Sequence, residues 1–442
     1  MLRTLTYPSA KCEAYLKTLE NRISAYPAKL ERYLKKIAED VKKKGDSALL
    51  EYTERFDKVK LTANALRIED EEIERAYREV SEELLSAIRL AIKQVRQFHE
   101  KNLPQSWIES FTKGIIVGQV VRPVSSCGLY IPGGKGGETP LISTVIMTAV
   151  PAKIAGVPRL IMVSPPRVDG SLHPALLVSA KEAGVDEVYR VGGPWSIFAL
   201  AFGTETIPKV DLICGPGNIY VTLAKKLVAF QTGIDFLAGP SEVVVVADGS
   251  ANPKFVVWDL LAQAEHDPES LSILITPSKR LAKAVKNLLP KEMSILPRKE
   301  IAEKALKKHG AIIVVSSLDE AMELVNRIAP EHLELAVENP EELLFEVKNA
   351  GAVFLGHYTP EAMGDYLAGP NHVLPTMGLA RFASALSADK FLKKINFLKY
   401  TKLALFAQAK EVVTLANAES LFAHAQAVRV RLEENLQEGE KT

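Results

Sequence analysis

Four of the eight histidines in this chain stand close to carboxylic acids or amides, the partners that histidine needs to bind a metal or move a proton. The stretch "LAQAEHDPES" follows an apolar run and places Gln263 three residues before His266. On a helix these two side chains would project from the same face. An amide oxygen and an imidazole nitrogen would form half of a divalent-metal site, to be completed by a carboxylate from elsewhere. Taken alone, the spacing fits a solvated helix face more simply.

A second pair, Glu331 and His332, is adjacent in "APEHLEL". The preceding proline is expected to end the helix "LDEAMELVNRIA". Histidine titrates near neutral pH and suits a general base, and a carboxylate beside it could activate a water molecule. The alternative is an acid that stabilises the first turn of a helix.

Two further histidines have acidic neighbours, in "GDYLAGPNH" (Asp365, His372) and "AESLFAH" (Glu419, His424). The other four have no converging polar partners in their surroundings. We interpret them as surface or packing residues: His99, His173, His309 and His357.

The glycine-rich segments indicate a nucleotide site only weakly. The P-loop pattern is absent, but "GPGN" (215–218) follows a predicted strand and opens a predicted helix, as a phosphate-binding turn does. Tyr220 stands where the third glycine of the dinucleotide fingerprint would be, so that pattern fails. "YIPGGKGG" is equally compatible with a mobile flap.

The elements that must position these residues follow from the apolar periodicity. The first hundred residues predict amphipathic helices, for example over 27–45 and 81–102. From residue 115 short apolar runs alternate with helical stretches, and a second such set follows residue 241. This alternation predicts parallel sheets whose loops at the carboxyl ends of the strands carry ligands. From about residue 386 we expect helix to the end of the chain.

Composition limits the classes of partner. The 442 residues carry 55 basic and 54 acidic side chains, a net charge of +1, so no basic surface for nucleic acid or a membrane is expected. The N-terminus has no secretory signal, and no window is apolar enough to span a bilayer. The three cysteines, which are far apart (Cys12, Cys127 and Cys214), suit a reducing compartment. We therefore expect a soluble, cytoplasmic, multi-domain protein.

Taken together, the motifs resemble one family, histidinol dehydrogenase, the zinc- and NAD-dependent enzyme of the last steps of histidine biosynthesis. The matching segments run in order along nearly the whole chain: "YTERFD", "RPVSSCGLYIPGG", "PAKIAGV", "GTETI", "VDLICGPGNIYV", "GIDFLAGPSEVVVVAD", "DLLAQAEHD", "APEHLEL", "NAGAVFLG", "GDYLAGPNHVLPT" and "LFAHAQAVRVRL". So long a series of motifs makes chance similarity an inadequate explanation.

The predicted fold class is α/β, with two Rossmann-like doubly wound α/β domains, one inserted in the other, and helical N-terminal and C-terminal extensions. We expect an N-terminal arm over 1–25 and a first α/β domain over 26–130 and 239–385, which carries the zinc and catalytic residues. The inserted second domain, over 131–238, would bind NAD. Residues 386–442 would form a C-terminal helical dimerisation segment.

The resemblance implies a role for each matching residue. One zinc ion per subunit would be bound by Gln263, His266, Asp365 and His424, and Glu331 with His332 would be the acid–base pair. The implied substrate contacts are Ser241, Gln263, His266, His332, Glu361, Asp365, His372, Glu419 and His424. In this family the C-terminal segment crosses to the partner subunit, which implies a homodimer whose active site is shared, with Glu419 and His424 completing the partner's site.

The implied reaction is a four-electron oxidation of L-histidinol to L-histidine through L-histidinal, with two NAD⁺ molecules used in turn. His332 would remove the alcohol proton and then help Glu331 activate water. Zinc would chiefly hold and orient the substrate, and NAD would carry the hydride.

The chain departs from the family pattern at the cofactor site. "GGPWS" replaces the usual "GGAQA", so Trp195 stands where a glutamine contacts NAD, while Tyr130 and Asn218 match the other NAD contacts. The indole of Trp195 either stacks on a ring of the cofactor or packs within the protein.

Three other functions compete with this interpretation. A related zinc- and NAD-dependent dehydrogenase could act on another amino-alcohol or diol, although the substrate-side residues Glu361, His372 and Glu419 match closely. A zinc hydrolase could use Glu331 as its base without NAD, which Trp195 favours and Asn218 opposes. A non-catalytic nucleotide-binding scaffold would not need metal ligands drawn from three distant segments.

Overall fold

The computed structural model describes residues 2–22, 28–134, 137–237 and 239–439, with the backbone alone over 434–439. The chain forms two compact units. The first comprises 1–103 and 124–391, and the second 104–123 and 392–442. No helix among the described residues is both long and apolar enough to cross a membrane.

The first unit contains a six-stranded parallel sheet built around a strand of consecutive valines, because a strand covered on both faces needs apolar side chains in both directions. In spatial order its strands are β1 (Arg3–Thr6), β11 (Ala311–Val314), β10 (Leu271–Thr276), β9 (Glu242–Ala247), β12 (His332–Ala336) and β13 (Ala352–Leu355).

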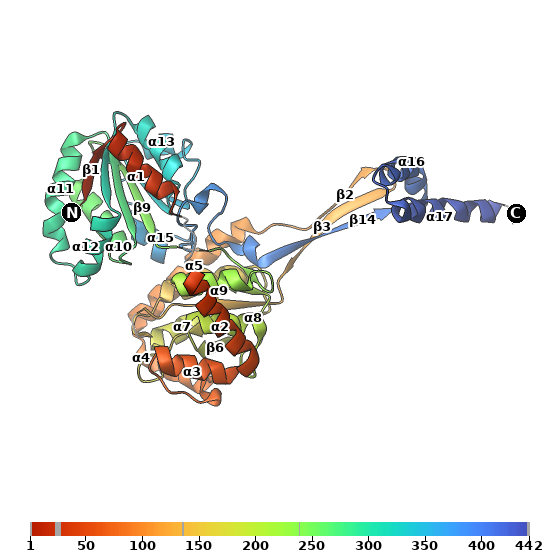
Figure 1. The fold of residues 1–442 in the computed structure, drawn as a ribbon, viewed down its shortest axis with the longest axis horizontal. Coiled ribbons are helices and arrows are strands. Elements are labelled where there is room, and N and C mark those ends of the chain that lie inside the picture. The colour runs from red at the N-terminus through yellow and green to blue at the C-terminus, as the bar shows by residue number, and fades with distance from the viewer. Residues whose placement is uncertain (1, 23–27, 135–136, 238, 440–442) are drawn as a thin grey trace. The chain divides into compact units, whose positions relative to one another are not determined.

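Helices cover both faces of this sheet (Figure 1). Val243 and Val245 of β9 pack in one apolar cluster with α10–α12, whereas Val244 and Val246 pack in the opposite cluster with α1 and α13. The helices associated with this sheet are α1 (Ala10–Glu20), α10 (Pro253–Ala264), α11 (Lys279–Met293), α12 (Lys299–Lys308), α13 (Leu318–Ile328), α14 (Pro340–Leu344) and α15 (Glu361–Tyr366).

A five-stranded parallel sheet forms the other half of this unit, and its strands lie in sequence between β1 and β9. Their spatial order is β6 (Glu187–Arg190), β5 (Arg159–Ser164), β4 (Ser126–Tyr130), β7 (Leu212–Cys214) and β8 (Gly233–Ile234). The associated helices are α2 (Ala28–Lys44), α3 (Asp46–Phe56), α4 (Asp70–Glu79), α5 (Glu82–His99), α6 (Ile142–Ile154), α7 (Pro174–Glu182), α8 (Gly193–Phe202) and α9 (Ile219–Val228). The predicted fold of two doubly wound α/β sheets, one inserted in the other, is confirmed.

The domain boundaries differ from those expected. Residues 26–130 were expected to belong with the first domain, but the apolar stripe of α2 (Leu34, Ile37 and Val41) packs in one cluster with Ile161 and Val163 of β5. Strand β4, also within that range, belongs to the inserted sheet. Residues 1–25 were expected to form an arm, yet β1 pairs with β11 and α1 packs against α13.

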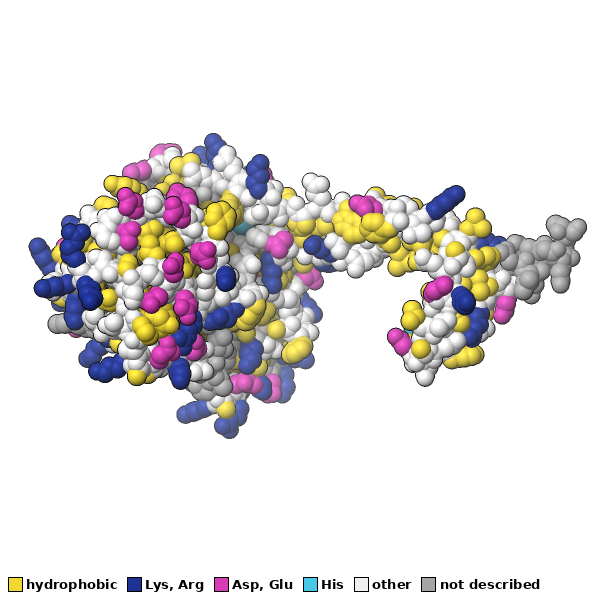
Figure 2. Space-filling view, turned by 90° about the horizontal axis from the view of Figure 1, so that it is seen from above, with side chains coloured by type: hydrophobic (Ala, Val, Ile, Leu, Met, Phe, Trp, Pro, Cys, Tyr) yellow, Lys and Arg dark blue, Asp and Glu magenta, His cyan; other side chains and the backbone are white. Residues whose placement is uncertain are grey.

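The second unit is a three-stranded antiparallel sheet followed by two helices, and it carries many exposed apolar side chains (Figure 2). Its elements are β2 (Trp107–Thr112), β3 (Ile115–Pro123), β14 (Leu392–Tyr400), α16 (Lys402–Ala418) and α17 (Phe422–Gly439). The expectation of helix from residue 386 onward is therefore wrong, because β14 pairs with the whole of β3. The polar sequence "LKKINFLKY" shows no core-facing alternation because the strand is mostly exposed.

Short 3₁₀ turns link some of these elements. Those bounded within the described residues include η1 (Ala63–Ala65), η2 (Glu100–Asn102), η4 (Leu379–Arg381) and η5 (Ala388–Phe391).

Candidate active site

The candidate catalytic residues lie at the amino edge of the six-stranded sheet. Glu331 directly precedes β12, and His332 is its first residue. Ser241 precedes the neighbouring strand β9 in the same way, and His332 is in register with Val243. We expected ligand-binding loops at the carboxyl ends of the strands, and at this sheet that expectation is wrong. Pro330 ends α13 as predicted, but a buried strand follows it, not a helix.

His332 is oriented by a backbone carbonyl. Its Nδ1 lies 3.0 Å from the carbonyl oxygen of Glu242. Because a carbonyl only accepts, Nδ1 carries the proton and donates it, which leaves Nε2 with a lone pair. This Nε2 is buried and has no hydrogen-bond partner among the described residues. Burial lowers the pKa of His332 to about 4, so the ring is neutral at pH 7.

Glu331 contacts the same strand end. The backbone N–H of Glu242 donates to its Oε2 at 2.8 Å, and that oxygen lies 3.6 Å from Nδ1 of His332. Burial raises the pKa of Glu331 well above its ordinary value. The pair therefore combines a neutral imidazole with a carboxyl group that holds its proton more strongly than a solvated one.

A cluster of one imidazole and two carboxylates lies beside this pair. His266, Glu361 and Asp365 each offer one ligand atom, and these three atoms lie within 4.8 Å of one another. Nitrogen and carboxylate oxygen donors at this separation suit Zn²⁺. Burial, followed by the charge of Asp365, raises the pKa of Glu361 well above its ordinary value. A cation between these groups would offset their mutual repulsion.

Gln263 reaches the cluster through Glu361. In the amide orientation that satisfies both side chains, its nitrogen donates to the two carboxylate oxygens at 2.8 and 3.0 Å. The proposed common helix face is wrong in detail: α10 ends at Ala264, and His266 lies in the turn that follows it. That turn is closed by the His266 N–H, which donates to the Gln263 carbonyl oxygen at 3.3 Å.

His372 contacts Asp365. Its Nδ1 is 3.0 Å from the Asp365 carbonyl oxygen and 3.8 Å from Oδ1 of the same residue. Burial lowers the pKa of His372. The loop that carries His372 is thus tied to α15 next to the metal cluster.

Glu419 and His424 belong to the second unit, where Glu419 caps α16 and His424 lies in the first turn of α17. Of the implied zinc ligands, the first unit therefore supplies Gln263, His266 and Asp365.

Comparison with known proteins decides the family. The family model for histidinol dehydrogenase matches residues 21–432. The chain is 52% identical to the histidinol dehydrogenase of Synechococcus sp. over 401 residues, which cover 91% of this chain and 92% of the relative. The chain belongs to the histidinol dehydrogenase family. The histidinol dehydrogenase of Caldanaerobacter subterraneus is 51% identical over 413 residues, 93% of this chain and 95% of the relative.

A solved structure agrees. The histidinol dehydrogenase of Elizabethkingia anophelis superposes with a TM-score of 0.91 at 40% identity and covers 98% of both chains. The function expected from the sequence, dehydrogenation of histidinol, is confirmed, and a relative acting on another alcohol is not favoured.

The two NAD contacts expected from the resemblance, Tyr130 and Asn218, belong to the inserted sheet and the helix that follows its strand β7. Tyr130 ends β4 and is buried, and Asn218 follows β7. Sheet order reverses between these two strands, and α/β sheets bind ligands at such a reversal, beyond the carboxyl ends of the strands. A Cβ on Gly215 would lie 2.1 Å from the Tyr130 carbonyl oxygen, so only glycine allows this close approach. Asn218 caps α9 by accepting from the N–H groups of Tyr220 and Val221.

Trp195 is enclosed in an aromatic stack. Its ring centroid lies 5.8 Å from that of Tyr52 and 5.4 Å from that of Phe56, and only 4% of the residue is exposed. A Cβ on Gly193, which has φ of 60°, would lie 2.5 Å from the indole. Of the two alternatives for Trp195, these surroundings support packing.

Two residues near the site were missed by sequence reasoning. Glu242 contacts both members of the candidate catalytic pair, and Arg22 forms an ion pair with Glu242. Glu242 could have been recognised from the sequence, because it begins the apolar run "EVVVVA" and a buried acidic residue requires a partner. The sequence offered no corresponding signal for Arg22.

Proposed function

We propose that this chain oxidises L-histidinol to L-histidine in two NAD-dependent steps, with one zinc ion per subunit. The observation that carries the proposal is the unpartnered Nε2 of the buried, neutral His332, next to Glu331 and the His266–Glu361–Asp365 cluster. A hydrolase needs only the acid and the metal, whereas an alcohol oxidation also needs a base for the hydroxyl proton.

In the first step Nε2 of His332 removes the hydroxyl proton of histidinol, while the carbinol hydrogen leaves with its electron pair as hydride and L-histidinal forms. In the second step the aldehyde takes up water, activated by Glu331 with the help of His332. The resulting hydrate loses a proton and a hydride to become the carboxylic acid. A raised pKa makes the ionised form of Glu331 a stronger base toward water than a solvated carboxylate.

Gln263, His266 and Asp365, with His424 of the partner subunit, would hold zinc, and Glu361 lies close enough to join them. Bound zinc would supply a positive centre that orients the imidazole and amine nitrogens of the substrate. The other substrate contacts proposed from the resemblance are Ser241, His372 and Glu419.

NAD would bind beyond the carboxyl ends of β4 and β7, between Tyr130 and Asn218, and would accept the hydride. Two observations support this position. Gly215, which has no Cβ, lies close to the backbone of Tyr130, and the N-terminus of α9 follows "GPGN". We assign Trp195 to packing beneath this site.

The assay that tests this function combines purified protein, NAD⁺ and a panel of alcohols, with NADH followed by absorbance. We expect NADH from histidinol, its loss with a chelator, and its return with added Zn²⁺. Turnover of another alcohol without turnover of histidinol would contradict the substrate assignment. Absence of redox chemistry with every alcohol would point to the hydrolase.

We further propose a homodimer with shared active sites. The second unit exposes apolar side chains that a partner subunit would cover, including Phe111, Leu398, Leu403 and Phe422. Mixing inactive His332→Asn and His424→Ala subunits should restore activity, because one site of each mixed dimer would be intact. Confirmed subunit exchange without recovered activity would contradict the shared site.

The cytoplasm is the proposed location. All three cysteines are buried and free, as in a reducing compartment.

A further inference from the structure

The backbone of one residue, Glu242, contacts both catalytic side chains. Its N–H donates to Glu331, and its carbonyl oxygen accepts from Nδ1 of His332. A shift of the Glu242 backbone would disturb the carboxyl group and the imidazole together. The hydrogen bond to the carbonyl also fixes the tautomer that leaves Nε2 available as the base.

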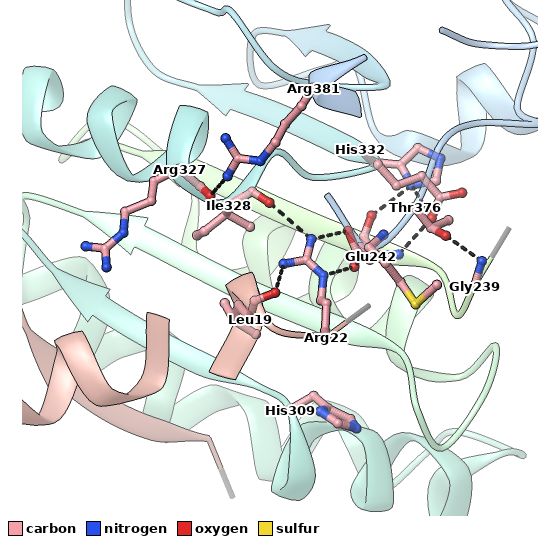
Figure 3. A network of polar contacts seen from close by, with 12 residues as sticks. Leu19, Arg22, Gly239, Glu242, His309, Arg327, Ile328, His332, Thr376 and Arg381 are labelled. Atoms are coloured by element: carbon pink, nitrogen blue, oxygen red, sulfur yellow. Dashed lines mark hydrogen bonds and ion pairs between the residues drawn. The ribbon is translucent and has the colours of Figure 1, made fainter. Parts of the chain in front are cut away.

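The side chain of Glu242 anchors this stretch of backbone. Its Oε1 lies 2.7 Å from Nε of Arg22, its Oε2 accepts from Nη2 at 2.9 Å, and the backbone N–H of Met377 donates to Oε1 at 3.0 Å (Figure 3). Only 2% of Glu242 is exposed. Burial raises the pKa of this carboxyl group, and the charge of Arg22 opposes the rise. Without Arg22 the carboxylate would be a buried, unpaired charge.

Arg22 is itself fixed by backbone carbonyls. It donates to Leu19 in the last turn of α1 at 2.9 Å and to Ile328 at the end of α13 at 3.1 Å (Figure 3). Ile328 stands three residues before Glu331. One guanidinium group thus joins the end of α1, the start of β9 and the turn that delivers the catalytic pair. Its planar fork suits this task better than a lysine would.

We propose that Arg22 and Glu242 are positioning residues that set the orientation and tautomer of His332. The inference rests on the proposed function for its kinetic test, but not for its spectroscopic one. Loss of an interaction that orients a functional side chain through an intermediate group costs about 10- to 100-fold in activity in comparable sites.

The kinetic test compares Arg22→Met, Glu242→Gln and their double variant. We expect kcat with histidinol to fall about 10- to 100-fold while KM changes less than about threefold, since neither side chain is proposed to touch substrate. The double variant should lose no more than the worse single variant, because the two residues act as a unit. Arg22→Lys keeps the positive charge and serves as a second variant in case Arg22→Met does not fold. We expect its activity to lie between those of the wild type and Arg22→Met.

Arg327→Met is the matched control. Arg327 holds α1 through Glu13, at 2.8 Å, and Glu20, at 2.5 Å, without contacting Glu242. It should lower the thermal midpoint while leaving kcat near that of the wild type. An equal loss of kcat in this control would show that docking of α1, and not positioning of Glu242, limits the rate, and would overturn the proposal.

The second readout is independent of turnover. Histidine labelled with ¹⁵N, with the His332 signal assigned by its absence in His332→Asn, reports the tautomer in the metal-free protein. We expect a ring protonated at Nδ1 in the wild type and in Arg327→Met, and a mixture of tautomers in Arg22→Met. An unchanged tautomer in Arg22→Met overturns the proposal whatever the rates. If the wild type makes no NADH from histidinol, the proposed function is wrong. The tautomer of His332 would still test whether Arg22 and Glu242 position this side chain.

Discussion

Oε1 of Glu361 lies 3.6 Å from Nδ1 of His332. The same carboxylate belongs to the cluster with His266 and Asp365, so Glu361 joins the proposed general base to the candidate metal centre. The backbone N–H of Glu361 donates to Oε1 of Glu334 at 2.8 Å, and this hydrogen bond helps to fix the position of Glu361. The resemblance had given Glu361 only a substrate contact.

Glu361→Gln tests this shared position. We expect kcat/KM for histidinol to fall about 10- to 100-fold and zinc to be retained less firmly, because the charge between His266 and His332 is lost. Metal content after dialysis and steady-state rates measure the two effects. The exposed Glu341→Gln on α14 is the control. Full activity together with full zinc content would remove Glu361 from the site.

His332→Asn tests the base. We expect turnover to fall about 10²- to 10⁴-fold while zinc stays bound, because the proton acceptor is lost and the metal cluster is not. Rates and zinc content of the purified variant measure this. A normal rate would remove His332 from the mechanism.

Trp195→Gln, which introduces the family's usual residue, tests the packing assignment. Losing the indole from the stack with Tyr52 and Phe56 should lower the free energy of unfolding by roughly 3 kcal/mol. Trp195→Phe should be much milder, and neither variant should change KM for NAD⁺ more than about threefold. A large rise in that KM for Trp195→Phe, without lost stability, would instead make Trp195 a cofactor contact.

His99 should make stability depend on pH. It is fully buried, and neither ring nitrogen has a hydrogen-bond partner among the described residues. Burial lowers its pKa from 6.5 to about 4. Between these values the unfolded chain binds a proton that the folded protein excludes, so stability falls as the pH falls from 6.5 to 4.

The expected size of this effect is about 2 kcal/mol between pH 7 and pH 5. Urea unfolding of the wild type and of His99→Leu at both values isolates it, because the other titrating groups are common to both proteins. The difference in free energy of unfolding between the two proteins should shift by that amount in favour of His99→Leu at pH 5. If the difference in free energy of unfolding between the two proteins is the same at both pH values, His99 is hydrated or protonated in the folded state.

The sequence predicted the sheets better than their edges. Apolar runs such as "EVVVVA" and "LSILIT" require burial on both faces, so β9 and β10 were recognised. Strands β1 and β14 are mostly exposed and carry no such signal. Periodicity also left the pairing of α2 with β5 undetermined, because an apolar stripe does not specify which sheet it covers.

For the site, the spacing of residues predicted proximity only between side chains that are close in the sequence. Adjacency put Glu331 beside His332, and the family motifs supplied Asp365 and Glu361 from a distant segment. The edge of the sheet was predicted incorrectly because the rule for carboxyl-end loops does not account for α10, which returns Gln263 to the amino edge. Arg22 could not have been recognised, since its role depends on a fold that brings residues 22 and 242 together.

We propose that one site performs both oxidations. The most direct measurement is the ratio of NADH formed to L-histidine formed in the presence of excess NAD⁺ and purified protein. We expect two NADH for each histidine, with no aldehyde released into solution. One NADH for each histidinol consumed, with L-histidinal accumulating, would contradict it.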